Sequence, residues 1–231
     1  MRSRPLPTPK KPPRTRLVRE ARVPLILEIA LDLFARQNYA SVTTRDITKA
    51  CGVNVALIYY YFGNKEGLFR AVIEHAMDKA YRTYAKRTRG THDPTRDIVE
   101  WFRVNLDQFT SLKKMAQICV AYNSSGTKIP NVDALIERIY RDERRLLCAC
   151  IRRGIASGQF RAVDPVATST FISTQLDGVC FVSMTRPETD VTPILDSARD
   201  LVLDYLLRDR KSMAPGGARF DTRIRRGRQR V

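Results

Sequence analysis

The sequence has 231 residues, 43% of them hydrophobic, and a formal net charge of +17 at pH 7. A chain of this length and apolar content can bury a sizeable core, which excludes disorder throughout and predicts one or two domains. The lack of a run of about eighteen apolar residues predicts no membrane span. The basic amino terminus has no apolar stretch behind it, unlike a secretory signal, so we expect a cytoplasmic protein.

Residues that could carry metal or catalytic chemistry are sparse. The five cysteines are scattered along apolar segments and lack paired C-x-x-C spacing, which argues against a disulfide framework or a metal site. The two histidines, His75 and His92, show neither metal-ligand spacing nor a partnered nucleophile. There is no phosphate-binding glycine loop, and we therefore expect no enzyme activity and no cofactor.

The basic excess is concentrated at the two ends of the chain. Residues 1–22 carry +7 and residues 211–231 carry +6, which leaves +4 for residues 23–210. Prolines in the first segment and Pro215-Gly216-Gly217 in the second disfavour regular structure, so both segments are expected to be flexible basic arms. Such charge indicates a polyanionic partner, although arms that serve only solubility fit it equally well.

The pattern between the arms is helical, and its first part indicates a helix-turn-helix. Residues 24–37 form one apolar stripe, with Pro24 suited to the first turn. Thr43 can cap a second helix, running to about residue 51, and Asp46 can complete a capping box. Gly52 favours the left-handed conformation that ends this helix, and Asn54 can cap the next one.

A third helix over residues 55–62 would place Ile58 and Phe62 against the first two helices. Its other side chains are then free for solvent or a DNA groove; they are Val55, Ala56, Leu57, Tyr59 and Tyr60. Tyrosine hydroxyls can donate to phosphate oxygens, and small apolar side chains can contact thymine methyl groups. Lys65, at the start of the next helix, can add an ionic phosphate contact. The alternative is a helical hairpin with aromatic core residues.

Residues 26–69 resemble the DNA-binding domain of the TetR family of transcriptional regulators. The matching residues are Ile26-Leu27, Ala30, Leu33-Phe34, Tyr39, Thr43-Thr44-Arg45-Asp46-Ile47, Gly52-Val53, Ile58-Tyr59-Tyr60-Tyr61-Phe62, Lys65-Glu66 and Leu68. The resemblance implies a DNA-binding domain over residues 23–69. Its implied DNA contacts are Thr44, Arg45, Asn54, Val55, Ala56, Leu57, Tyr59, Tyr60, Tyr61 and Lys65. The family's usual glycine before Tyr39 is Asn38 here.

The residue pattern in the remaining two thirds of the sequence predicts a second helical domain over residues 70–210. Helices are expected over 68–86, 97–110, 112–122, 132–157, 165–185 and 192–207, which gives about nine helices and an all-α fold. In outline this part resembles the ligand-binding and dimerisation domain of the same family. Side chains that could line a ligand pocket, and are equally suited to packing, are Trp101, Phe102, Tyr122, Phe171, Gln175 and Phe181.

The last two expected helices have wider apolar bands than one neighbour needs. Pairing them with their symmetry mates would make a four-helix dimer interface. The candidate interface residues are Phe171, Gly178, Val182, Ile194, Ala198, Leu201 and Tyr205. An intramolecular core is the alternative.

The family resemblance implies a homodimeric repressor that binds a palindromic double-stranded operator and is released by an unknown small-molecule effector. Two identical DNA-binding domains, which we call heads, can read two half-sites of a palindrome in successive major grooves. The alternatives are a TetR-like activator and a non-specific protein that coats DNA through charge and loses affinity steeply with salt.

Overall fold

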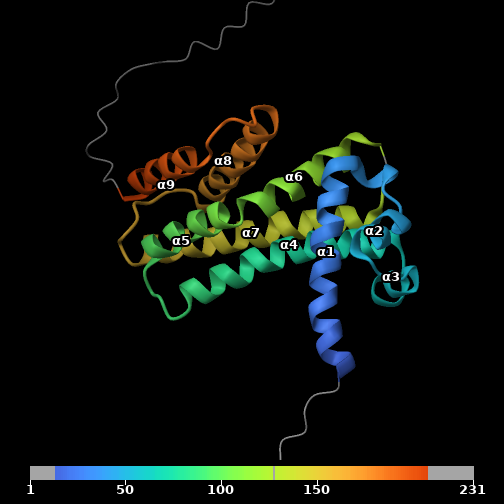
Figure 1. Cartoon of the computed structure of the whole chain (residues 1–231). Helices are drawn as coiled ribbons and strands as arrows, with labels where there is room; N and C mark the ends of the chain where they lie inside the picture. Colours follow the sequence, from blue (N-terminus) through green and yellow to red (C-terminus); the bar gives the residue numbers. More distant parts are fainter. Residues whose placement is uncertain (1–13, 127, 208–231) are drawn as a thin grey trace, which may run out of the picture.

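The computed structural model describes residues 14–126 and 128–207. Within this range the chain forms nine α-helices and no strand (Figure 1), which confirms the predicted all-α class. The helices are α1 Arg14–Ser41, α2 Thr44–Cys51, α3 Val55–Phe62, α4 Lys65–Thr88, α5 Pro94–Asp107, α6 Phe109–Ser124, α7 Pro130–Ala156, α8 Pro165–Thr185 and α9 Thr192–Leu207. None of the helices in the described part is long and apolar enough to cross a membrane.

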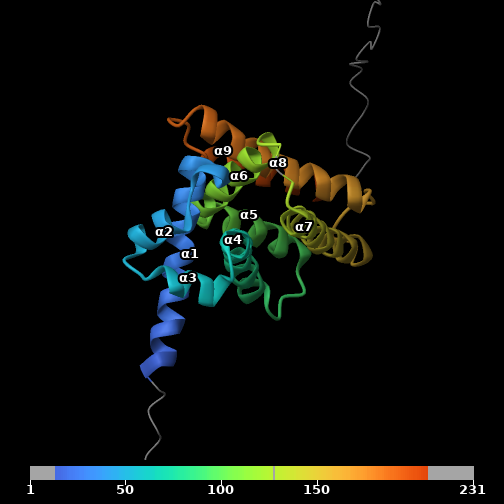
Figure 2. The same ribbon diagram turned by 90° about the vertical axis from the view of Figure 1, so that its right-hand side faces the viewer.

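Helix α1 begins ten residues before the expected start. It runs from Arg14, so Pro24 lies inside it rather than in its first turn. The prediction of a flexible arm over residues 1–22 is therefore wrong for residues 14–22, which are helical despite the proline's missing N–H. Figures 1 and 2 both show these first turns of α1 extending away from the body of the molecule. Residues 1–13 of the predicted arm and all of residues 211–231 lie outside the described range.

The regular part of α1 ends at Asn38, whose backbone has φ 63° and ψ 165°. A positive φ at this place explains why glycine suits it. Asn38 holds the turn with its own side chain, because its Oδ1 accepts hydrogen bonds from the Ser41 backbone N–H at 3.1 Å and from the Ser41 hydroxyl at 3.2 Å. The expected end of the first helix at residue 37 agrees with this break.

Helices in the second half of the chain begin next to residues that cap them. Helix α5 begins at Pro94, three residues earlier than expected, because the Asp93 side chain accepts from the Thr95 N–H at 3.0 Å. Asp164 caps α8 in the same way, with Pro165 at the first helical position. The predicted bounds of the last two helices agree with α8 and α9.

One hydrophobic core joins the amino-terminal helices to the rest of the chain. It contains buried residues of α1 to α4, among them Phe34, Ile47 and Phe69, together with Ile118 and Tyr122 of α6 and Val132 and Leu135 of α7. The ends of α6 and α7 therefore complete the core beneath the short helices α2 and α3.

A second core lies at the other end of the long helices. It is built from α5, α7, α8 and α9 around Trp101, Phe102, Leu147, Ile151 and Leu206. Helices α8 and α9 pack across α5, α6 and α7, and Figure 1 shows them at the opposite end of the molecule from α2 and α3.

Candidate nucleic-acid interface and internal cavity

Three caps define the start of α2 and the turn between α2 and α3. The Thr43 hydroxyl accepts from the Asp46 N–H at 3.2 Å, and Asp46 accepts from the Thr43 N–H at 2.9 Å, which completes the predicted capping box. Gly52 ends α2 in the left-handed conformation, with φ 65°. The Asn54 side chain then accepts from the Ala56 N–H at 2.9 Å and starts α3. The predicted helix-turn-helix is confirmed.

Helix α3 has one face in the core and one face exposed. Ile58 is fully buried, and Phe62 packs against the first core, as the spacing predicted. Tyr59 and Tyr60 are 51% and 75% exposed. Two adjacent exposed tyrosines on a short helix form a surface suited to phosphate contacts.

The other predicted contacts divide between the exposed face and the core. Val55, Ala56 and Arg45 are exposed, whereas Thr44 is half-buried. Leu57 and Tyr61 are half-buried against the first core, so they offer less of their side chains to a groove than the sequence pattern suggested.

The Lys65 side chain is half-buried and contacts other residues of the protein. Its ammonium donates to the Ala40 carbonyl at 3.3 Å and lies 4.4 Å from the centre of the Tyr39 ring. Partial burial lowers its pKa, and the nearby Asp46 carboxylate opposes this shift. A phosphate contact from Lys65 would require the ammonium to leave or share these partners.

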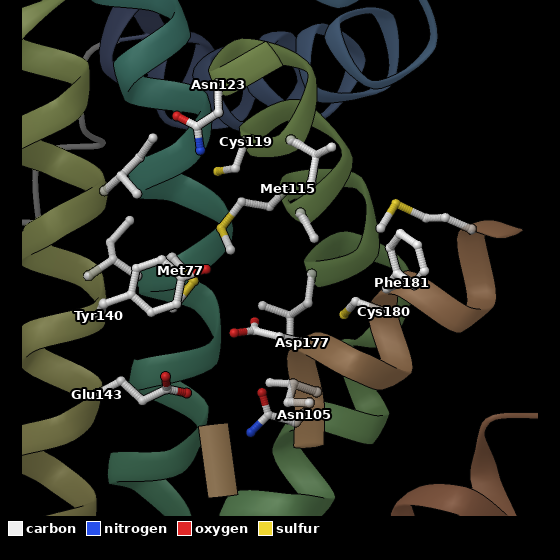
Figure 3. Close-up of a pocket in the computed structure, with 17 residues that line it drawn as sticks. Met77, Asn105, Met115, Cys119, Asn123, Tyr140, Glu143, Asp177, Cys180 and Phe181 are labelled. Atoms are coloured by element: carbon white, nitrogen blue, oxygen red, sulfur yellow. The ribbon is translucent and has the colours of Figure 1, made fainter. Parts of the chain in front are cut away.

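A cavity of about 330 Å³ lies between α4, α5, α6, α7 and α8 (Figure 3). Its lining is mostly apolar and sulfur-rich; the residues are Met77, Asn105, Leu112, Met115, Ala116, Cys119, Val120, Asn123, Ile136, Ile139, Tyr140, Glu143, Leu176, Asp177, Cys180, Phe181 and Met184. Val120, Tyr140 and Phe181 are also exposed at the surface, so the cavity is accessible from solvent. Its volume is in the range of small-molecule sites.

The cavity uses few of the residues that the sequence suggested for a pocket. Trp101 and Phe102 belong to the second core. The Tyr122 hydroxyl accepts from the Ile129 N–H at 2.7 Å and donates to Asp133 at 2.9 Å. Phe171 is exposed, and Gln175, although half-buried, does not line the cavity. Of the suggested residues only Phe181 lines it.

Helices α8 and α9 carry exposed apolar side chains that the described chain does not cover. Phe171, Phe181, Leu201 and Tyr205 are 56%, 60%, 69% and 48% exposed. Ile194 is partly exposed and Gly178 has open space around it, whereas Ala198 packs against the second core. Val182 is half-buried. Several exposed apolar side chains on two adjacent helices are a feature of protein interfaces.

A helix-turn-helix head on a larger helical body with an internal cavity defines a class of DNA-binding regulators. Residues 26–72 match the family model described as bacterial regulatory proteins, tetR family. The HTH-type transcriptional regulator YfiR of Bacillus subtilis is 24% identical over 80% of this chain and 92% of its own length. The HTH-type transcriptional repressor KstR2 of Mycolicibacterium smegmatis is 21% identical over 59% of this chain and 66% of its own.

A transcriptional regulator from Saccharomonospora viridis, solved in complex with choline, has the same fold. It aligns with a TM-score of 0.70 and 22% identity over 83% of this chain and 100% of the other chain. Residues 26–72 therefore form a DNA-binding domain of the TetR type, and most of the chain is similar to helix-turn-helix transcriptional regulators in sequence and fold.

Proposed function

We propose that the protein is a homodimeric repressor whose α3 helices read a palindromic operator. The observation that carries this proposal is the exposed face of α3. Tyr59 and Tyr60 are exposed there, whereas the preceding Ile58 is fully buried. The tyrosine hydroxyls would donate to phosphates, while Val55 and Ala56 contact thymine methyl groups and Arg45 serves as the main polar reader. The protein would act in the cytoplasm, on DNA of the nucleoid.

The dimer would form through α8 and α9. Helices α8 and α9, which carry these exposed apolar side chains, lie far from α3 (Figure 1), so pairing here leaves both heads free. A pair related by twofold symmetry matches a palindrome, which one short helix cannot read alone.

The effector would bind in the cavity and change the spacing of the two heads. Helix α4 supports this coupling, because Phe69 and Ile73 pack in the core beneath α3 while Met77, one turn further, lines the cavity. Helix α6 forms a second link, since Lys114 makes an ion pair with Asp32 of α1. A ligand shifts such an equilibrium only by its difference in affinity for the two arrangements.

Selection of binding sites from random duplexes tests the reading function. With residues 14–207 at moderate salt, we expect enrichment of a palindrome. Enrichment of no sequence would favour the alternative of charge-driven coating. Replacing the thymines of the selected half-sites with uracil should weaken binding, because it removes the methyl groups; unchanged affinity would contradict the roles of Val55 and Ala56.

A reporter gene placed behind the selected operator tests the sign of regulation. Higher expression in the absence of the protein is expected for a repressor. Lower expression would favour the activator alternative while leaving the DNA-binding proposal intact.

A further inference from the structure

The cavity contains two carboxylates and no basic side chain. Among the described residues, Glu143 of α7 and Asp177 of α8 are the only charged ones that line it, and the others are apolar, aromatic, thiol, thioether or amide side chains. Figure 3 shows both carboxylates on facing helices, directed into the same space near Asn105. An apolar cavity with a small number of polar groups is suited to a ligand whose orientation those groups fix.

Neither carboxylate is neutralised by the described part of the chain. No lysine, arginine or histidine nitrogen of the described residues lies within 4.0 Å of either one. The Ser173 hydroxyl is the neighbouring polar group that favours the ionised form of Glu143 and lowers its pKa. Lys113, which acts electrostatically on Cys180, directs its ammonium to the Ser183 carbonyl at 2.7 Å instead. The two negative groups therefore have room for a positive charge that the protein does not supply.

The surroundings of Glu143 keep it poorly solvated, whereas Asp177 keeps an exposed part. Burial raises the pKa of Glu143 to about 7; the Asp177 charge adds to the shift and the Ser173 hydrogen bond opposes it. Burial also raises the pKa of Asp177. Burial raises the pKa of Cys119 on α6 and of Cys180 on α8 to about 12 in each case, so these thiols are neutral at pH 7.

Aromatic side chains lie on both sides of Glu143. Tyr140, one turn earlier on α7, lines the cavity, and burial raises the pKa of its phenol to about 12. A smaller recess shares Glu143, Met77 and Asn105 with the cavity and is lined by Tyr81, Tyr84 and Trp101. Burial, with help from the Glu143 charge, raises the pKa of Tyr81, so this phenol is neutral too. Aromatic faces together with carboxylates are the usual recognition elements for organic cations.

We propose that the effector is a lipophilic cation, with its positive group between Glu143 and Asp177 and its apolar part among the methionine, leucine and isoleucine side chains. This inference rests on the proposed function, which makes the cavity the effector site. A fatty or aromatic carboxylate would add a third negative charge to the same space, and a neutral ligand would leave both acids without a partner.

Binding of a permanent cation should release protons. The cation favours ionised Glu143, so the pKa of this group is lower in the complex than its free value of about 7, and the complex holds fewer protons. The affinity therefore rises with pH and levels off above the free pKa. From about pH 8 to about pH 6 the affinity should fall about tenfold through Glu143 alone.

The test uses the full chain and three probes in isothermal titration. Benzyltrimethylammonium is the cation, neopentylbenzene is its neutral carbon isostere, and decanoate is the anion. We expect the cation to bind at least about tenfold more tightly than the isostere, with the pH dependence above. Glu143→Gln should remove both the preference and most of the pH dependence, and Asp177→Asn should reduce the preference. Glu137→Gln, an exposed position on α7, should change neither.

Each outcome bears on a different part of the proposal. Equal binding of the isostere, stronger binding of decanoate, or no binding of the cation at about 1 mM would overturn the cation inference. Operator binding and dimerisation, measured separately, would then still stand. Cation binding that leaves operator affinity unchanged would support the ligand class and contradict the effector role of the cavity. Because Glu143 is about half protonated near pH 7 and glutamine has nearly the same shape, Glu143→Gln should fold normally, and its unfolding curve checks this.

Discussion

Tyr122 offers a sharp test of whether an aromatic side chain in this fold serves packing or ligand binding. Its hydroxyl joins the end of α6 to the start of α7 by accepting from the Ile129 N–H at 2.7 Å and donating to Asp133 at 2.9 Å. Tyr122→Phe keeps the ring, which is 1% exposed, and removes these two bonds together with a longer one to the Ile129 carbonyl at 3.4 Å. A buried donor left without its acceptor costs about 1–3 kcal/mol.

The loss should fall in the lower half of that range, because Ile129 is half-buried and water can reach its N–H. We expect the free energy of unfolding to drop by about 1–2 kcal/mol, which for a chain of this size lowers the melting temperature by about 2–8 °C. Urea and thermal unfolding followed by circular dichroism measure both quantities. Tyr140→Phe is the matched control, because the Tyr140 hydroxyl makes no hydrogen bond within the described residues. Unchanged stability of Tyr122→Phe together with weaker effector binding would refute the reasoning.

Three further changes test the head, the interface and the packing of α7. Tyr60→Phe removes one exposed hydroxyl and should weaken operator binding about 3- to 10-fold without changing stability; fluorescence anisotropy measures this, and full affinity would argue against a phosphate contact. Leu201→Glu places a charge on the apolar face of α9 and should give monomers in analytical ultracentrifugation, whereas Leu201→Ala should stay largely dimeric. Dimers of the glutamate variant would move the interface elsewhere. Gly154→Ala would bring a Cβ within 2.1 Å of the buried Phe160 ring and should cost about 1–3 kcal/mol of stability. Adding Phe160→Leu should recover part of this loss, and a stable single variant would show that the ring can move.

The head could be predicted from the sequence because its determinants are local. Thr43, Asp46, Gly52 and Asn54 each act on backbone groups within a few residues, so their spacing alone defines two helix starts and one helix end. The start of α1 could not be predicted in this way. Pro24 is common in first turns, and nothing local showed that the helix continues back to Arg14.

The cavity was harder to predict because it is a region that packing leaves unfilled. Its lining comes from five helices far apart in the chain, and most of it is small or flexible rather than aromatic. Large aromatic side chains such as Trp101 and Phe102 were predicted as candidate ligand contacts, but they pack in the second core. The two acids were a usable indication, since Glu143 and Asp177 lie next to apolar cavity-lining positions of α7 and α8, but their proximity depends on how those helices pack.

The shared core beneath α3 limits how this regulator can be rebuilt. Ile118, Tyr122, Val132 and Leu135 complete the hydrophobic interior of the first three helices, so a fragment cut after residue 69 would expose that interior to water. A chimera that grafts this head onto another sensor should therefore carry the facing ends of α6 and α7 with it. By the same reasoning, new operator specificity is more safely obtained by changing exposed positions of α3 in place than by exchanging the head as a cassette.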